Sequence, residues 1–222
     1  MRSMSSSPRI IPAVLETSFD EVRKKIHLVE DFAPWVQVDV CDGLFAHPET
    51  WREPDLLNSV EGKVKIEAHL MVEHPEGEIV AWTSVADRII VHYEATDVLE
   101  SLVDTMEHSV ARLGVALCMD TPVEVLRPYT QKLSHIQLMG IAEIGGQGRL
   151  LDEKIFNRIK ELRALYPSAT ITIDGGVTLD TISSLRDAGA TAFVVGSALF
   201  RSEDIVTRWN AFNDTLSHGT ST

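Results

Sequence analysis

Residues 170–195 read TITIDGGVTLDTISSLRDAGATAFVV and contain one complete strand–helix–strand unit. The runs Thr170–Ile173 and Thr191–Val195 are rich in β-branched residues, which is typical of strands. Between them, apolar residues recur at helical spacing: Ile182, Leu185 and Ala188. We expect Thr178 to cap this helix and Gly189 to end it.

The same alternation of strands and helices continues along the whole chain. Eight segments are predicted as strands: Ile10–Leu15, Trp35–Val40, Val64–His69, Arg88–His92, Val115–Met119, His135–Met139, Thr170–Ile173 and Thr191–Val195. Helical spacing predicts further helices over 99–113, ending at Gly114, and over 151–162. A shorter helix is expected from Thr121-Pro122 to Pro128.

Eight strand–helix units in 222 residues predict an α/β fold, the (β/α)₈ TIM barrel. The main alternative is a doubly wound open sheet, which is less favoured because the strands recur evenly and no Gly-x-Gly-x-x-Gly follows the first strand. No linker or shift in composition divides the chain. We therefore expect one domain over residues 1–222, with flexible tails at 1–8 and 217–222.

The composition is that of a folded acidic protein, with 44% hydrophobic residues, 24% charged residues and a formal net charge of −13. The acidic balance argues against nucleic acid or an anionic membrane surface as partner, because both require clustered Lys and Arg. It does not argue against a small anion that is held by local donors. The two cysteines, Cys41 and Cys118, match no metal-pair or redox spacing and indicate a reducing compartment.

No run of 18 apolar residues is present, and residues 1–8 lack the apolar region of a signal peptide. A cytoplasmic protein is therefore expected. The sequence leaves the oligomeric state open, a homo-oligomer included.

Polar side chains stand at the ends of several predicted strands, where barrels carry their chemistry. Because side chains alternate along a strand, Gln37, Asp39 and Cys41 share one face, and Glu67, His69 and Met71 share another. Asp174 ends strand seven, and His92 ends strand four. The pattern predicts that Asp39, His69 and Asp174 converge on one site, with His92 as a further candidate. A buried structural network of hydrogen-bonded acids is the alternative.

Glycine-rich turns follow the last three predicted strands. They contain Gly145, Gly146 and Gln147 after strand six, Gly175 and Gly176 after strand seven, and Gly196 and Ser197 after strand eight. Glycine allows backbone N–H groups to converge on an anion without any lysine. Each turn by itself could be ordinary, but together they predict a phosphate site at the mouth of the barrel.

With these features, the sequence resembles the ribulose-phosphate 3-epimerases, a family of phosphate-binding (β/α)₈ barrels. The matching segments are Ile11-Pro12-Ala13-Val14-Leu15, Val38-Asp39-Val40-Cys41-Asp42-Gly43, Ala68-His69-Leu70-Met71, Val91-His92-Tyr93-Glu94, Gly145-Gly146-Gln147, Ile173-Asp174-Gly175-Gly176-Val177 and Val195-Gly196-Ser197-Ala198-Leu199-Phe200. The resemblance covers nearly the whole chain. It is more specific for the fold than for the substrate.

The resemblance implies an isomerase that epimerises a sugar phosphate such as D-ribulose 5-phosphate. Asp39 and Asp174 match the family's acid and base, which remove a proton from one face of a carbon and return it to the other. The family also holds a divalent metal (Zn, Fe, Mn or Co), and Asp39, His69 and Asp174 match three of its ligands. Met71 and Met139 are further candidates for the site.

This chain departs from the family pattern at several positions of the expected site. Gln37 stands where the family has its fourth metal ligand, a histidine, and an amide oxygen is a weaker ligand for zinc or iron. Ala13 replaces a serine, and Cys41 replaces a methionine. The loop 141–147 is shorter and carries the acidic Glu143, an awkward neighbour for a phosphate.

The main hypothesis is a divergent sugar-phosphate epimerase in which Gln37 leaves the metal weaker, altered or absent. One alternative is an aldol-type synthase or decarboxylase of the same superfamily, which is less favoured because residues 39–42 lack the lysine of an Asp-x-Lys-x-x-Asp signature. The other alternative is a non-catalytic protein that keeps the phosphate site. The sequence does not choose between sugar phosphates.

Overall fold

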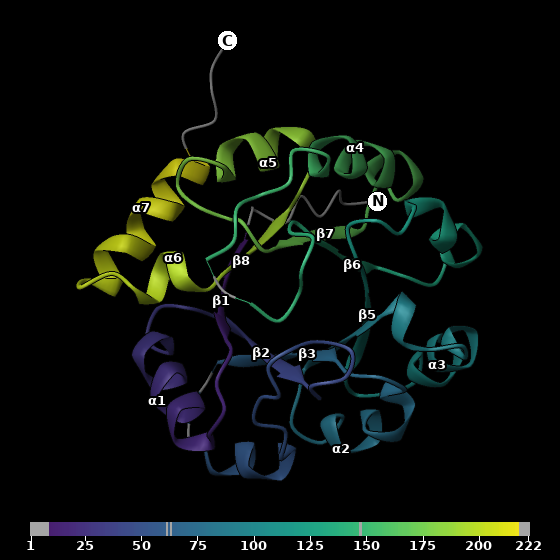
Figure 1. Cartoon of the computed structure of the whole chain (residues 1–222), viewed down its shortest axis with the longest axis horizontal. Coiled ribbons are helices and arrows are strands. Elements are labelled where there is room, and N and C mark those ends of the chain that lie inside the picture. Colours follow the sequence, from purple (N-terminus) through teal and green to yellow (C-terminus); the bar gives the residue numbers. More distant parts are fainter. Residues whose placement is uncertain (1–8, 61, 63, 147, 218–222) are drawn as a thin grey trace.

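The computed structural model describes residues 9–60, 62, 64–146 and 148–217. Within these residues eight parallel strands pair in chain order, and β8 pairs with β1, so that the sheet closes. Figure 1 shows the strands gathered at the centre with the helices outside them. The predicted (β/α)₈ barrel is therefore confirmed.

The strands of the barrel are β1 (Arg9–Val14), β2 (Trp35–Cys41), β3 (Lys65–Met71), β4 (Arg88–His92), β5 (Arg112–Leu117), β6 (His135–Met139), β7 (Thr170–Asp174) and β8 (Ala192–Val195). The α-helices are α1 (Phe19–Val29), α2 (Ile79–Trp82), α3 (Leu99–Met106), α4 (Ile155–Leu165), α5 (Ile182–Ala188), α6 (Ser197–Phe200) and α7 (Ile205–Ser217). Short 3₁₀ helices are η1 (Pro54–Ser59), η2 (Pro75–Gly77), η3 (Tyr93–Ala95) and η4 (Val123–Tyr129). None of the described helices is long and apolar enough to cross a membrane.

The alternation of side chains along β2 separates the two layers of the protein. Val36, Val38 and Val40 belong to the main hydrophobic core, which they share with apolar residues of the outer helices. Gln37 and Asp39 do not belong to that core and lie on the opposite face of the strand, inside the barrel. The outer layer therefore supplies the burial of apolar surface that stabilises the fold, and the inner layer is free to carry polar groups.

The register between strands sets which polar groups lie at the same level. Asp39 of β2 pairs with His69 of β3. On the other side of the barrel, Met139 of β6 pairs with Asp174 of β7. Parallel pairing therefore brings the ends of β2, β3 and β7 to one end of the barrel.

The opposite end of the barrel is filled around Trp35, the first residue of β2. The cationic groups of Arg88, Lys65 and Arg9 lie over its ring at 4.4, 5.3 and 5.5 Å from the centroid. Arg88 also forms an ion pair with the fully buried Glu67. These side chains pack together at the floor of the barrel, the end opposite the carboxylates.

One helix prediction was wrong at its C-terminal end for a reason that the packing explains. The helix predicted over 99–113 stops at Met106, and Gly114 lies within β5. A Cβ at Gly114 would lie 2.8 Å from His135 Cδ2 and 3.2 Å from Ile90 Cγ1, so this glycine makes room inside the barrel and ends no helix. The fifth strand consequently begins at Arg112 and ends at Leu117.

Smaller corrections concern helix ends. The residue before α5 is Thr181, and Thr178 lies three residues earlier, while Gly189 ends that helix with a φ of 119° as expected. The segment predicted as a helix ending at Pro128 is the 3₁₀ helix η4, which includes that proline. Ser217, expected in a tail, is the last residue of α7. The remaining tail residues, 1–8 and 218–222, lie outside the described part of the chain.

Candidate active site

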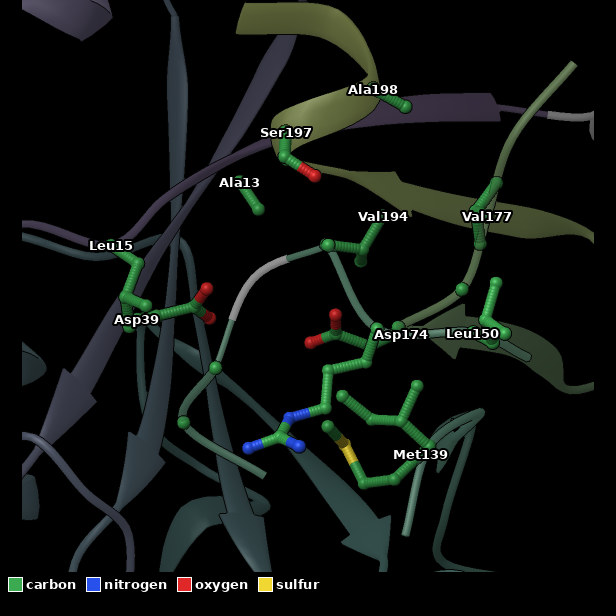
Figure 2. A pocket seen from close by; sticks show the side chains of 18 of the residues that line it. Ala13, Leu15, Asp39, Met139, Leu150, Asp174, Val177, Val194, Ser197 and Ala198 are labelled. Carbon is green, nitrogen blue, oxygen red and sulfur yellow. The ribbon is translucent and has the colours of Figure 1, made fainter. Parts of the chain in front are cut away.

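A pocket opens at the end of the barrel where the strands finish (Figure 2). Asp39 of β2 and Asp174 of β7 reach into it, and in Figure 2 their carboxylates point toward each other. Other predicted site residues that line it are Met71, Met139, Gly145, Gly146, Gly175, Gly176, Gly196 and Ser197. The predicted carboxylates and glycine turns therefore share one cavity.

Gln37 and His69 lie beneath the carboxylates and join them. Gln37 Nε2 donates hydrogen bonds to Asp39 Oδ1 and to Asp174 Oδ2, each at 2.7 Å. His69 Nδ1 lies 3.1 Å from Asp39 Oδ1 and 3.3 Å from Asp174 Oδ2. Gln137 of β6 donates a further bond to Asp174 Oδ2 at 2.9 Å. Side chains of β2 and β3 thus hold Asp39, and side chains of β2, β3 and β6 hold Asp174.

The electrostatics of this cluster depend on burial and on the contacts between its members. Burial raises the pKa of Asp39, and the charge of Asp174 raises it further, against hydrogen bonds from His69 and Gln37 that lower it. Burial lowers the pKa of His69, but its bonds to Asp174 and Asp39 overcome that effect and raise the pKa to about 9. The protonation of Asp39 therefore depends on that of His69, and the reverse.

A second set of contacts leads from His69 away from the carboxylates. His69 Nε2 lies 2.9 Å from His92 Nε2, and the two rings stack with centroids 5.1 Å apart. His92 Nδ1 faces Glu94 Oε2 at 3.4 Å and Cys118 Sγ at 3.5 Å. His92, a sequence candidate, thus contacts the cluster through His69 and does not line the pocket.

The glycine turns surround the other side of the pocket. Gly145, Gly175 and Gly176 have φ values of 82°, 94° and 72°, which side chains rarely adopt. At Gly176 a Cβ would lie 2.6 Å from Leu151 Cα, so only glycine fits there. Ser197 begins α6 directly after Gly196, and Figure 2 shows its hydroxyl at the pocket. Gln147, the remaining predicted residue, lies outside the described part of the chain.

The family model described as Ribulose-phosphate 3 epimerase family matches residues 9–200. The chain belongs to the ribulose-phosphate 3-epimerase family.

Curated relatives agree with this membership over most of their length. A ribulose-phosphate 3-epimerase from Schizosaccharomyces pombe is 29% identical over 202 residues, which cover 88% of this chain and 88% of that protein. One from Mycobacterium leprae is 27% identical, with 89% and 90% covered. Among solved structures, KGPDC from Streptococcus mutans has a TM-score of 0.72 at 15% identity, with 97% of this chain and 100% of that chain covered. That likeness shows the barrel fold alone.

Members of the ribulose-phosphate 3-epimerase family use a divalent metal, and three donors of this chain fit one. Asp39, His69 and Asp174 each offer a ligand atom within 4.8 Å of the others. Carboxylate and imidazole ligands suit Zn, Fe, Mn and Co. The cluster is therefore a candidate cation site.

The fourth expected ligand, Gln37, does not present its ligand atom in this structure. Its Nε2, which carries hydrogens, faces the carboxylates. Its Oε1 is buried and has no hydrogen-bond partner among the described residues. A half-turn of the amide would exchange the two atoms, so this family member has three ready donors and a fourth that must rotate first.

Two residues that sequence reasoning did not single out belong to the site. Arg149 lines the pocket beside the glycine turn and pairs with Glu143, Nη2 to Oε2, at 2.6 Å. This ion pair neutralises the acidic residue that the sequence placed awkwardly near a phosphate. Gln137 bonds to Asp174, and its signal in the sequence was its position two residues before Met139, on the same face of β6.

Proposed function

We propose that the protein is a ribulose-phosphate 3-epimerase that interconverts ketose phosphates of the D-ribulose 5-phosphate and D-xylulose 5-phosphate type. The observation that carries the proposal is that Asp39 and Asp174 face each other across a pocket whose other wall is built from glycine turns. The first feature suits proton transfer on two faces of one carbon. The second suits a phosphate group.

The reaction requires one carboxylate to be ionised while the other is protonated. The ionised carboxylate removes the proton from carbon 3, and the electron pair of the broken C–H bond forms an enediolate with the neighbouring carbonyl. The protonated carboxylic acid then delivers its proton to the opposite face of the same carbon. The bound sugar has inverted at carbon 3, and the two acids have exchanged their protonation states.

Other residues of the cluster hold the acids in place for this exchange. Gln37 and Gln137 donate to the carboxylates, so neither acid can rotate away from the reacting carbon without breaking short hydrogen bonds. Asp39, His69 and Asp174 are the residues that would hold the family's cation, whose positive charge would stabilise the developing enediolate.

Phosphate binding is assigned to the glycine turns and to one side chain. Backbone N–H groups near Gly146, Gly176 and Ser197 border the pocket, and Arg149 is the cationic side chain among its lining residues. Local donors of this kind attract a phosphate although the net charge of the chain is −13.

The test is exchange of the carbon 3 proton of D-ribulose 5-phosphate with deuterium from solvent, followed by NMR. We expect the unmodified protein to exchange and epimerise, and Asp39→Asn and Asp174→Asn each to lose epimerisation. Asp42→Asn is the matched control, because the Asp42 carboxylate accepts backbone N–H bonds from Leu44, Phe45 and Glu73 and does not line the pocket. Full exchange in both Asp39→Asn and Asp174→Asn would refute two-base transfer. Phosphate binding without exchange in the unmodified protein would support the non-catalytic alternative.

A further inference from the structure

Three metal-ligating side chains meet at the ends of β4 and β5, outside the pocket of Figure 2. His92 ends β4, Glu94 lies two residues later, and Cys118 directly follows β5. One ligand atom from each lies within 4.8 Å of the other two. The His92 side chain is fully buried, while 22% of the Glu94 side chain is exposed, so the group can be reached from solvent.

Two of the three separations within this group match those of ligands around one tetrahedral cation, and the third lies within 4.8 Å. With zinc–sulfur bonds of about 2.3 Å, and zinc–nitrogen and zinc–oxygen bonds of about 2.05 Å, tetrahedral angles place nitrogen about 3.5 Å from sulfur and about 3.3 Å from oxygen. His92 Nδ1 lies 3.5 Å from Cys118 Sγ and 3.4 Å from Glu94 Oε2. We propose that His92, Glu94 and Cys118 bind a zinc-like divalent cation at the mouth of the barrel.

Backbone contacts hold the carboxylate and the thiol of this group in place. Cys118 N donates to Glu94 Oε1 at 2.8 Å, which leaves Oε2 directed at His92. Arg158 Nη1 donates to the carbonyl of Cys118 at 2.8 Å and fixes the segment that carries the sulfur. The ligands therefore need little rearrangement to receive an ion.

The contact between the two histidines completes the coordination chemistry. A neutral imidazole that binds a metal through Nδ1 carries its proton on Nε2, and a fixed acceptor for that proton orients the ring. His69 Nε2 lies 2.9 Å from His92 Nε2, so cation binding through His92 Nδ1 requires a neutral His69 that keeps its proton on Nδ1, facing the carboxylates, and accepts through Nε2. The proposed site is thereby linked to the carboxylate cluster through His69 but shares no ligand with it.

The ligand set selects the class of cation. Thiolate and imidazole favour zinc and similar borderline metals over magnesium or calcium, and a third, carboxylate ligand is common at zinc sites with an open fourth position.

The test uses Co²⁺ as a probe, because a cobalt–thiolate bond gives a near-ultraviolet charge-transfer band that other ligands do not give. We expect the band in the unmodified protein and its loss in Cys118→Ser. Cys41→Ser is the matched control: Cys41 is the other cysteine and ends β2 beside the carboxylate cluster, and this variant should keep the band. Circular dichroism melting of each variant shows whether it is folded.

Two further variants make the result specific. Glu94→Gln keeps the sulfur but should weaken the Co²⁺ binding reported by the charge-transfer band by at least about tenfold, and an unchanged affinity would count against Glu94 as a ligand. Asp174→Asn should keep the cobalt band, so that the outcome does not depend on the proposed epimerase. Absence of the band from the unmodified protein, its survival in Cys118→Ser, or its loss in folded Cys41→Ser or Asp174→Asn would overturn the proposal.

Discussion

Replacement of Gln37 by alanine should tighten the binding of a hard divalent cation to the carboxylate cluster. In this structure the amide nitrogen occupies the place between Asp39 and Asp174 and donates to both at 2.7 Å. A cation that enters between the carboxylates must break these two bonds. In Gln37→Ala there are no such bonds to break, and the two carboxylates lose the donor that bridges them.

The size of the effect follows from the contacts. Hydrogen bonds to charged groups contribute about 1.5–3 kcal/mol each. Taking the middle of this range, breaking two of them costs the cation roughly 4.5 kcal/mol of binding free energy. When the amide turns, the buried Oε1 of Gln37, which has no hydrogen-bond partner here, comes to face the cation. This contact recovers about 2 kcal/mol of binding free energy. The difference, about 2.5 kcal/mol, corresponds to a Kd that is roughly sixtyfold lower in the variant.

The assay is isothermal titration calorimetry with Mn²⁺, which prefers carboxylates over the thiolate of the proposed second site. Gln131→Ala, a substitution of an exposed glutamine, is the control and should leave the Kd unchanged. A Kd that rises in Gln37→Ala would refute the reasoning, because it would mean that the amide oxygen serves as a ligand and turns at little cost.

Two other substitutions probe the glycine turns and a buried histidine. Gly176→Ala places a Cβ 2.6 Å from Leu151 Cα at a φ of 72°, so it should lower the free energy of unfolding by about 2–4 kcal/mol and weaken inorganic phosphate binding. Gly77→Ala is the control, because a Cβ there has nothing within 4 Å, and it should have neither effect. Equal midpoints of urea unfolding for the two variants would contradict this prediction. Burial, with the charges of Arg88 and Arg9, holds the pKa of His135 well below 6.5, so only the unfolded chain takes up this proton as the pH falls below about 6.5. Between pH 7.5 and 5.5 the free energy of unfolding, measured by urea titration, should therefore fall by about 1.4 kcal/mol more in the unmodified protein than in His135→Gln. A difference in unfolding free energy between the two proteins that does not change with pH would disprove this.

The fold could be predicted from the sequence because each strand–helix unit carries its own local signal. The predicted strands all exist, and the alternation of side chains correctly paired Gln37 with Asp39 on the inner face of β2. The prediction of helix ends failed at Gly114, because a glycine can either end a helix or make room inside a strand. Gly114 had the position of a helix cap, but the width available between Ile90 and His135 decides its role.

The candidate site could be predicted only as far as strand ends reveal it. Asp39, His69 and Asp174 follow from strand periodicity and indeed converge. The sequence did not indicate Cys118 as a neighbour of His92, because the predicted fifth strand ran to Met119. In the structure β5 ends at Leu117, and the Cys118 side chain contacts His92. The orientation of the Gln37 amide depends on competition among neighbours from β3 and β7, which a linear pattern does not contain.

The side chains packed around Trp35 lie at the end of the barrel opposite the pocket. Because Arg9, Lys65 and Arg88 pack over that ring, we expect a molecule that reaches Asp39 and Asp174 to leave through the same pocket by which it entered. In a reversible inversion both epimers would then enter and leave through the same pocket, and each would compete with the other for it. Net turnover in either direction would accordingly slow as the departing epimer accumulates in solution.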